Sequence, residues 1–330
     1  MEASHRNRSE LRRRRYPRSV SFSTSVLRPL ILRVAEHPWS RKLVTGTRPG
    51  RAVAFRFVAG ELLDEAMEVA STLDRRRITS MLDFLGENVS TEVQAEAARA
   101  AYLDALAAIA RSQDLDCAIA LKPTQLGLDV SLETCLANIE PILQAAERNG
   151  TVVMLDMESV GYVDPTLRVF REAHARYPKV GVALQSYLRR TGRDLEKLPP
   201  GCRVRLVKGA YLEPPEVVFT NKREVDANFA RLFSTLFARG HSIDVATHDP
   251  RLLEGVRRRV DASGEGWSRA EFQMLYGVRR DLQLRFAGQG YPVRVYIPYG
   301  TEWYPYLTRR LAERPANVWF FLSNLLRTRR

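Results

Sequence analysis

Cysteine and histidine are scarce in this chain of 330 residues. Its three cysteines, Cys117, Cys135 and Cys202, are odd in number and not spaced as CxxC. This pattern argues against a disulfide framework and for a reducing compartment. The five histidines form no HxxxH or HxH pair, so ligands for a catalytic metal are few and we predict no metal site.

Long hydrophobic runs and a glycine-rich phosphate loop are also missing. No stretch approaches eighteen consecutive apolar residues, the length that would predict a transmembrane helix. No GxGxxG turn follows any apolar segment, and the nearest match, 264–266, lacks the third small residue. Hydrophobic residues nevertheless make up 45% of the chain, which is enough for a full core.

Positive charge is in excess, because 51 Lys and Arg residues outnumber 38 acidic ones and give a net charge of +13. Residues 1–20 hold seven arginines against two acidic residues, and residues 327–330 read RTRR. We predict a disordered basic tail over 1–25 and a basic end over 321–330, both attractive to anionic surfaces. Because the excess is largely terminal, we expect no specific nucleic-acid partner.

Short apolar segments alternate with longer amphipathic ones from residue 76 onward. The eight candidate strands are 78–85, 117–121, 152–155, 180–184, 204–207, 243–246, 272–275 and 293–297. Helical patterns lie between them, as at 93–110, where Thr91 and Gln94 predict a capping box. Apolar strands that are each followed by a helix favour a parallel (β/α)8 barrel over the alternative, an open doubly wound sheet. We assign the barrel to 76–320 and a helical arm, with patterns at 27–34 and 62–73, to 26–75.

The C-terminal ends of the predicted strands carry polar residues at nearly every position, and barrels of this class place their chemistry there. These residues are Lys122, Asp156, Glu158, Gln185, Arg205, Lys208, Thr247, His248, Asp249, Gln273 and Tyr296. A helical segment after the last strand adds Tyr306 and the adjacent Arg309 and Arg310. Paired guanidiniums beside aromatic rings suit a small carboxylate, since forked donors hold its oxygens. The strand ends therefore predict a site for an anionic substrate or cofactor.

Three chemistries are compatible with these residues alone. A Schiff-base lyase acting on a small carboxylate would use Lys122 or Lys208. Metal-assisted chemistry would use the strand-end carboxylates and His248, although this ligand set is thin. Cofactor chemistry would use the small residues at 209–210 for close approach and Arg205 as a hydrogen-bond donor to a heterocycle.

The ordered set of strand-end motifs resembles the proline dehydrogenase family, in particular its short monofunctional bacterial members. The motifs are LKPTQLGL (121–128), LDMES (155–159), YVDPTL (162–167), ALQSYLRRT (183–191), RLVKGAY (205–211), VATHD (245–249), FQMLYG (272–277), RVYIPYG (294–300) and WYPYLTRRLAERPAN (303–317). They follow the family's order and cover roughly residues 30–320. The resemblance implies a distorted (β/α)8 barrel with a final helix over its mouth. It also implies non-covalent FAD and oxidation of L-proline to 1-pyrroline-5-carboxylate.

The resemblance assigns a role to each matching residue. The catalytic residues would be Asp156, which hydrogen-bonds Tyr296, and Arg205, which lies near the flavin N5. The proline carboxylate would be held by Lys122, Arg309 and Arg310. The substrate ring would pack against Tyr211, Leu275, Tyr296 and Tyr306. FAD would be contacted by Met157, Gln185, Val207, Lys208, Gly209, Ala210, Thr247 and His248.

The resemblance also implies partners. The family passes electrons from reduced flavin to a membrane quinone, which implies a cytoplasmic enzyme with peripheral contact at the inner face of the membrane. The arginine-rich tails would favour anionic lipid at such a contact. A separate 1-pyrroline-5-carboxylate dehydrogenase would oxidise the product to glutamate, the second step of proline degradation.

Overall fold

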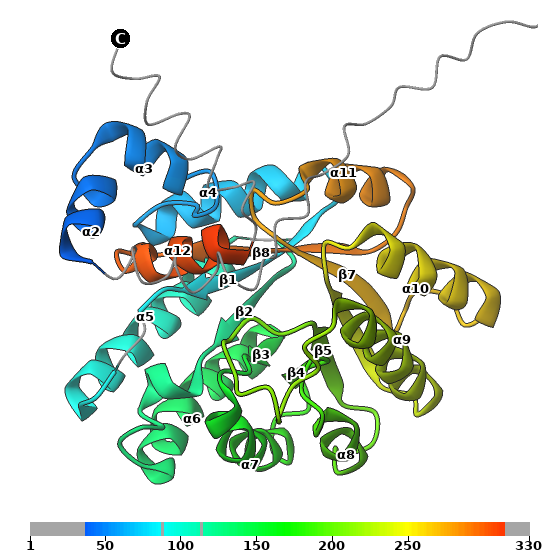
Figure 1. The fold of residues 1–330 in the computed structure, drawn as a ribbon. Coiled ribbons are helices and arrows are strands. Elements are labelled where there is room, and N and C mark those ends of the chain that lie inside the picture. The colour runs from blue at the N-terminus through cyan, green and yellow to red at the C-terminus, as the bar shows by residue number, and fades with distance from the viewer. Residues whose placement is uncertain (1–36, 87–88, 113–114, 314–330) are drawn as a thin grey trace, which may run out of the picture.

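Eight parallel strands close into a barrel in a computed structural model that describes residues 37–86, 89–112 and 115–313 (Figure 1). The strands are β1 (Thr79–Phe84), β2 (Cys117–Leu121), β3 (Val153–Leu155), β4 (Val180–Gln185), β5 (Arg203–Val207), β6 (Ser242–Ala246), β7 (Ala270–Leu275) and β8 (Val293–Tyr299). Each strand pairs with the next, and β8 returns to β1 with Tyr296 opposite Met81. The predicted (β/α)8 barrel is therefore confirmed, and the open sheet is wrong.

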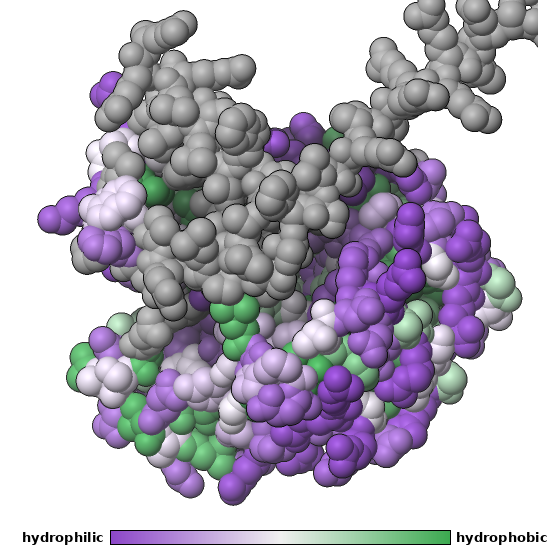
Figure 2. Space-filling view, viewed as in Figure 1, coloured by the Kyte–Doolittle hydropathy of each residue, from purple (hydrophilic) through white to green (hydrophobic). Residues whose placement is uncertain are grey.

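Helices cover the outer face of the barrel (Figure 1). They are α5 (Glu92–Arg111), α6 (Leu132–Asn149), α7 (Val163–His174), α8 (Thr191–Glu196), α9 (Lys222–Ala238), α10 (Pro250–Ser263) and α11 (Arg280–Gly288), with short 3-10 helices at Pro123–Leu126 and Val160–Tyr162. At the start of α5 the Thr91 side chain accepts from Gln94 N as predicted, but the Gln94 side chain accepts from Ser90 N instead of Thr91 N. The surface over α9 and α10 is mainly hydrophilic, as expected for helices whose apolar side faces the barrel (Figure 2).

The strands are buried on both faces, which explains why they read as continuous apolar segments. Ala118 and Ala120 pack with Met81 and Met154 in a small buried cluster, while Ala183 of β4 lines a cavity at the C-terminal ends of the strands. Lower down, four charged residues point inward and form what we call the barrel floor. They are Arg203, Asp244, Glu271 and Arg294. Ion pairs connect them, with Arg294 Nε 2.8 Å from Glu271 Oε1 and Arg203 NH1 3.4 Å from Asp244 Oδ1.

Three helices precede the barrel: α2 (Pro38–Thr45), α3 (Arg48–Ala54) and α4 (Leu63–Asp74). Helix α4 matches the helical pattern at 62–73. Figure 1 shows α2 and α3 beside α12 (Trp303–Glu313), the last described helix. A second hydrophobic cluster joins α2, α3 and α12 through Val44, Val53, Phe57, Trp303 and Leu307.

Some predictions fall outside the described ranges, namely the helix at 27–34 and the basic segments 1–25 and 321–330. The boundaries of the arm at 26–75 and of the barrel at 76–320 stay predictions. Over the residues that the structure describes, none of the helices combines the length and the apolar character needed to cross a bilayer.

Candidate active site

A cavity of about 710 Å³ opens at the C-terminal ends of the strands, with α12 at its edge. All of the residues to which the resemblance assigns a role line this one cavity, whereas the strand-end carboxylate Glu158 does not. It also contains residues that the sequence analysis did not assign to the site, of which Asp83, Lys222, Met274 and Arg279 are the most notable. The fold therefore brings together side chains from strand ends as distant in sequence as Asp83 and Tyr296, while the individual roles of the site residues stay predictions.

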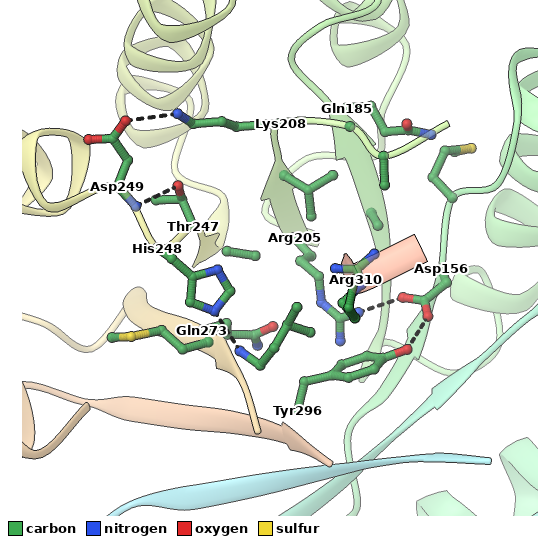
Figure 3. A pocket seen from close by; sticks show the side chains of 18 of the residues that line it. Asp156, Gln185, Arg205, Lys208, Thr247, His248, Asp249, Gln273, Tyr296 and Arg310 are labelled. Carbon is green, nitrogen blue, oxygen red and sulfur yellow. Dashed lines mark hydrogen bonds and ion pairs between the residues drawn. The ribbon is translucent and has the colours of Figure 1, made fainter. Parts of the chain in front are cut away.

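Asp156, directly after β3, connects two of the central side chains (Figure 3). Its Oδ1 accepts a hydrogen bond from Arg205 NH1 at 2.5 Å, and its Oδ2 accepts one from the Tyr296 hydroxyl at 2.6 Å. The Arg205 guanidinium also lies 5.1 Å from the centroid of the Tyr296 ring. Burial, together with the charges of Asp156 and Asp83, raises the pKa of Tyr296 well above its ordinary value, so this phenol remains a donor at neutral pH.

Lys122 follows β2 and forms a buried ion pair with Asp83 of β1. Its Nζ also lies 3.9 Å from Asp156 Oδ2. Burial raises the pKa of Asp83, and Lys122 offsets part of that rise. Asp83 was not predicted as a site residue, because it lies within the apolar segment 78–85. Its only signal was that it is the single carboxylate in that segment.

The mouth of the cavity is cationic. Tyr306, Arg309 and Arg310 of α12 line it, and the Arg310 guanidinium lies 5.3 Å from the centroid of the Tyr306 ring. Among the described residues at this end of the cavity, the cations are Lys122, Arg205, Arg309 and Arg310, and the carboxylates are Asp83 and Asp156. Since the cations are in excess, this end suits a ligand that carries a carboxylate.

Other groups that line the cavity suit a flat heterocycle that has both donors and acceptors. Gln185 donates from Nε2 to Glu158 O at 2.7 Å, while its buried Oε1 has no hydrogen-bond partner among the described residues. Arg205 Nε is likewise buried and has no hydrogen-bond acceptor among the residues that the structure describes. His248 Nε2 accepts from Leu275 N at 2.9 Å, which places the proton of a neutral imidazole on Nδ1.

Gly209 provides close backbone approach beside this surface. Its φ is 118°, in the left-handed region that favours glycine, and a Cβ there would lie 2.1 Å from Tyr187 Cδ1. Tyr187 is itself fixed by a hydrogen bond from its N to Lys208 O at 2.8 Å. The predicted contact surface at 207–210 therefore requires glycine at position 209. Together with the Gln185 acceptor and the Arg205 donor, it is compatible with the ring system of a flavin.

Four charged residues form a cluster at the outer edge of the cavity. Lys208 Nζ lies 2.5 Å from Asp226 Oδ1 and 3.0 Å from Asp249 Oδ2, and Lys222 Nζ lies 2.9 Å from the same Asp249 oxygen. Burial tends to raise the pKa of Asp249, but hydrogen bonds from Lys222 and Lys208 hold it below its usual range. Lys222 was missed because it begins α9, well beyond the end of β5.

Comparisons with known proteins agree on one family. A family model described as proline dehydrogenase matches residues 66–322. The chain is 39% identical over 285 residues to proline dehydrogenase 1 of Bacillus subtilis subsp. natto. The matched region covers 86% of this chain and 92% of that protein. It is 38% identical over 316 residues to the proline dehydrogenase of Deinococcus radiodurans, covering 91% of this chain and 98% of that one. The chain belongs to the proline dehydrogenase family.

Membership of the proline dehydrogenase family makes the protein an oxidoreductase of proline catabolism that acts by proline oxidation. A solved structure of proline utilization A (PutA) from Bdellovibrio bacteriovorus, inactivated by N-propargylglycine, matches with a TM-score of 0.74 and 27% identity. That match covers 79% of this chain and 32% of the PutA chain. The predicted monofunctional family and enzyme class are confirmed, and they favour cofactor chemistry over the Schiff-base lyase.

Proposed function

We propose that this cavity binds FAD and L-proline and oxidises the substrate to 1-pyrroline-5-carboxylate. One observation carries the proposal: a single cavity of this proline dehydrogenase has both a cationic end and a surface suited to a heterocycle. When bound, FAD would supply the two-electron acceptor for the oxidation. The residues proposed to hold it are Met157, Gln185, Val207, Lys208, Gly209, Ala210, Thr247 and His248.

The proline carboxylate is proposed to bind Lys122, Arg309 and Arg310. Binding energy at this end of the substrate fixes the position of the reacting carbon, which lies at the other side of the ring. The aliphatic ring is proposed to pack against Tyr211, Leu275, Tyr296 and Tyr306, which line the cavity. Such packing excludes water from the carbon that loses hydride.

Asp156 is proposed as a positioning group and not as a base. Both of its oxygens already accept hydrogen bonds, from Arg205 and from Tyr296, so neither is directed solely at a substrate proton. The hydride leaves the carbon next to the ring nitrogen, and the nitrogen must be unprotonated for its lone pair to form the C=N bond. Proline would therefore react as the neutral amine, and its proton would leave to solvent. The cation at Arg205 would favour an anionic reduced flavin and raise its potential.

We further propose a quinone as the electron acceptor and a separate 1-pyrroline-5-carboxylate dehydrogenase for the second step. A quinone is dissolved in lipid, so its use requires peripheral contact with a membrane surface. The net charge of +13 supports contact with anionic lipid.

The visible spectrum of the purified protein tests the proposal. We expect a flavin spectrum that bleaches after anaerobic addition of L-proline but not of D-proline, and that recovers on addition of a water-soluble quinone. Mass analysis of the cofactor released by heat should identify FAD and not FMN. A protein that stays colourless after incubation with FAD would refute the proposal and return the lysine-dependent lyase to consideration.

A further inference from the structure

The arm is joined to the end of the barrel by two backbone hydrogen bonds. Ala59 N donates to Pro298 O at 2.9 Å, and Gly300 N donates to Gly60 O at 3.0 Å. Residues 59–60 therefore pair with the end of β8, immediately before α12 begins. The position at which the chain enters α12 is thus set by the arm as well as by the barrel.

A side-chain cluster continues this connection, and we call it the Glu61 latch. It consists of Arg51, Glu61 and Trp303. Glu61 Oε1 accepts a hydrogen bond from Trp303 Nε1 at 2.8 Å and lies 3.0 Å from Arg51 NH1. The bond from Trp303, followed by that from Arg51, lowers the pKa of Glu61, so the carboxylate is ionised at neutral pH. The Trp303 side chain is buried and packs edge-on against Phe55 with 5.9 Å between ring centroids.

The latch acts on the helix that carries the proposed carboxylate ligands. Trp303 is the first residue of α12, and Tyr306, Arg309 and Arg310 of the same helix line the cavity. With a rise of about 1.5 Å per residue, Arg310 lies about 10 Å along the axis from Trp303. A tilt of the helix by only 10° at Trp303 would therefore move the arginine by ~2 Å. Misplacement on this scale is enough to weaken binding strongly.

We propose that Glu61 is a positioning residue for substrate binding: by holding the indole N–H of Trp303 it fixes α12 so that Arg309 and Arg310 meet the substrate carboxylate. The inference rests on the proposed function because it takes the ligand of these arginines to be the carboxylate of proline. Glu61 itself does not line the cavity and touches no reacting atom. Its effect should therefore appear in binding and not in the chemical step.

Two conservative variants of the holoenzyme test the latch. Trp303→Phe removes the N–H donor and keeps an aromatic ring, while Glu61→Gln keeps an acceptor oxygen and removes the charge. We expect Trp303→Phe to raise KM for L-proline about ten-fold, equivalent to about 1.4 kcal/mol, with kcat changed less than about two-fold. Glu61→Gln should have a smaller effect in the same direction. Glu302→Gln is the matched control, because the only pair it breaks among the described residues is the half-exposed one with Arg41, one residue before α12.

Direct binding separates the latch from the proposed reaction. Cyclopentanecarboxylate has the ring and the carboxylate of proline but no oxidisable C–N bond, so calorimetry with this probe does not depend on turnover. Its Kd should rise about ten-fold in Trp303→Phe but not in Glu302→Gln. Because the latch acts through both arginines, Trp303→Phe should weaken binding less in an Arg310→Met background than in the wild type.

Three results would overturn the inference. These are an unchanged Kd in both latch variants, a fall in kcat as large as the rise in KM, or full additivity with Arg310→Met. By contrast, a wild-type holoenzyme that binds cyclopentanecarboxylate but does not oxidise L-proline would refute the proposed function, and the latch would still be judged by the binding data.

Discussion

Replacing Asp244 with asparagine should stabilise the protein at neutral pH. Asp244 lies on the barrel floor and is completely buried, and neither carboxylate oxygen has a hydrogen-bond partner among the described residues. Burial, reinforced by the charge of Glu271, raises the pKa of Asp244 to about 6, although Arg203 and the neighbouring arginines oppose the rise. The folded protein thus holds a proton on Asp244 more tightly than the unfolded chain does.

The sign and size of the effect follow from this difference. Because the folded pKa lies above the unfolded value of 3.8, the contribution of Asp244 to the free energy of unfolding is highest below pH 4. It falls as the pH rises from about 4 to about 6 and then stays constant with respect to this group. A rise of about two pKa units corresponds to about 3 kcal/mol. Asp244→Asn cannot ionise, so it should be more stable than the wild type by up to about 3 kcal/mol at pH 7 and no more stable at pH 4.

Urea unfolding between pH 4 and pH 8, followed by near-UV circular dichroism, measures this difference. Asp116→Asn is a suitable control, because Asp116 is largely exposed and also pairs with the barrel floor, through Arg294 at 2.9 Å. It should show no comparable gain above pH 6. Parallel pH profiles for the wild type and Asp244→Asn would refute the reasoning. A less stable Asp244→Asn at pH 7 would show instead that the Arg203 ion pair outweighs the desolvation of the carboxylate.

Four other substitutions test the site. Arg310→Met should lower kcat/KM for L-proline, measured by steady-state kinetics, by an amount equivalent to roughly 2–5 kcal/mol of transition-state binding if the bond between Arg310 and the carboxylate is buried. A loss below two-fold would show that Arg310 does not bind the substrate. Gly209→Ala should reduce the flavin retained after purification and lower the melting temperature, because φ is 118° and the Cβ would clash with Tyr187; normal flavin content would contradict this. Asp156→Asn should reduce activity more than Tyr296→Phe does, because it also leaves the buried Arg205 without its carboxylate. Both variants should keep the alkaline limb of the pH–rate profile. Loss of that limb in Asp156→Asn, with Tyr296 still in place, would show that Asp156 is a base.

The barrel could be predicted from sequence because its strands are buried on both faces. The segment 117–121 coincides with β2, and the apolar segment at 243–246 begins one residue inside β6. Once a parallel barrel is assumed, polar residues just after such segments must meet at one end of it. For this reason Lys122 and Asp156 could be placed together although nothing local in the sequence links them.

Other features could not be predicted, because they depend on contacts that no local pattern records. Asp83 and Asp244 lie inside strands and point inward, so they were counted as parts of apolar segments. The bond between Glu61 and Trp303 joins residues 242 positions apart, and neither residue lies in a motif that suggests the other. Asp226 is a local partner of Lys222, four residues along α9, but Asp249 becomes its partner only when the starts of α9 and α10 are brought together.

The closure of the barrel has a consequence for how the protein is made. A ribosome releases the chain from its N-terminus, so residues 59–61 and β1 emerge long before the strand and helix that they contact. Until β8 is synthesised, one edge of β1 and the backbone groups of Ala59 and Gly60 lack their native partners. The docking of β8 and α12 then closes the sheet and brings Arg309 and Arg310 to the cavity in a single late event. A nascent chain therefore gains its proposed proline-binding site only after α12 has been synthesised, and a chain that lacks β8 exposes a sheet edge that chaperones would have to protect.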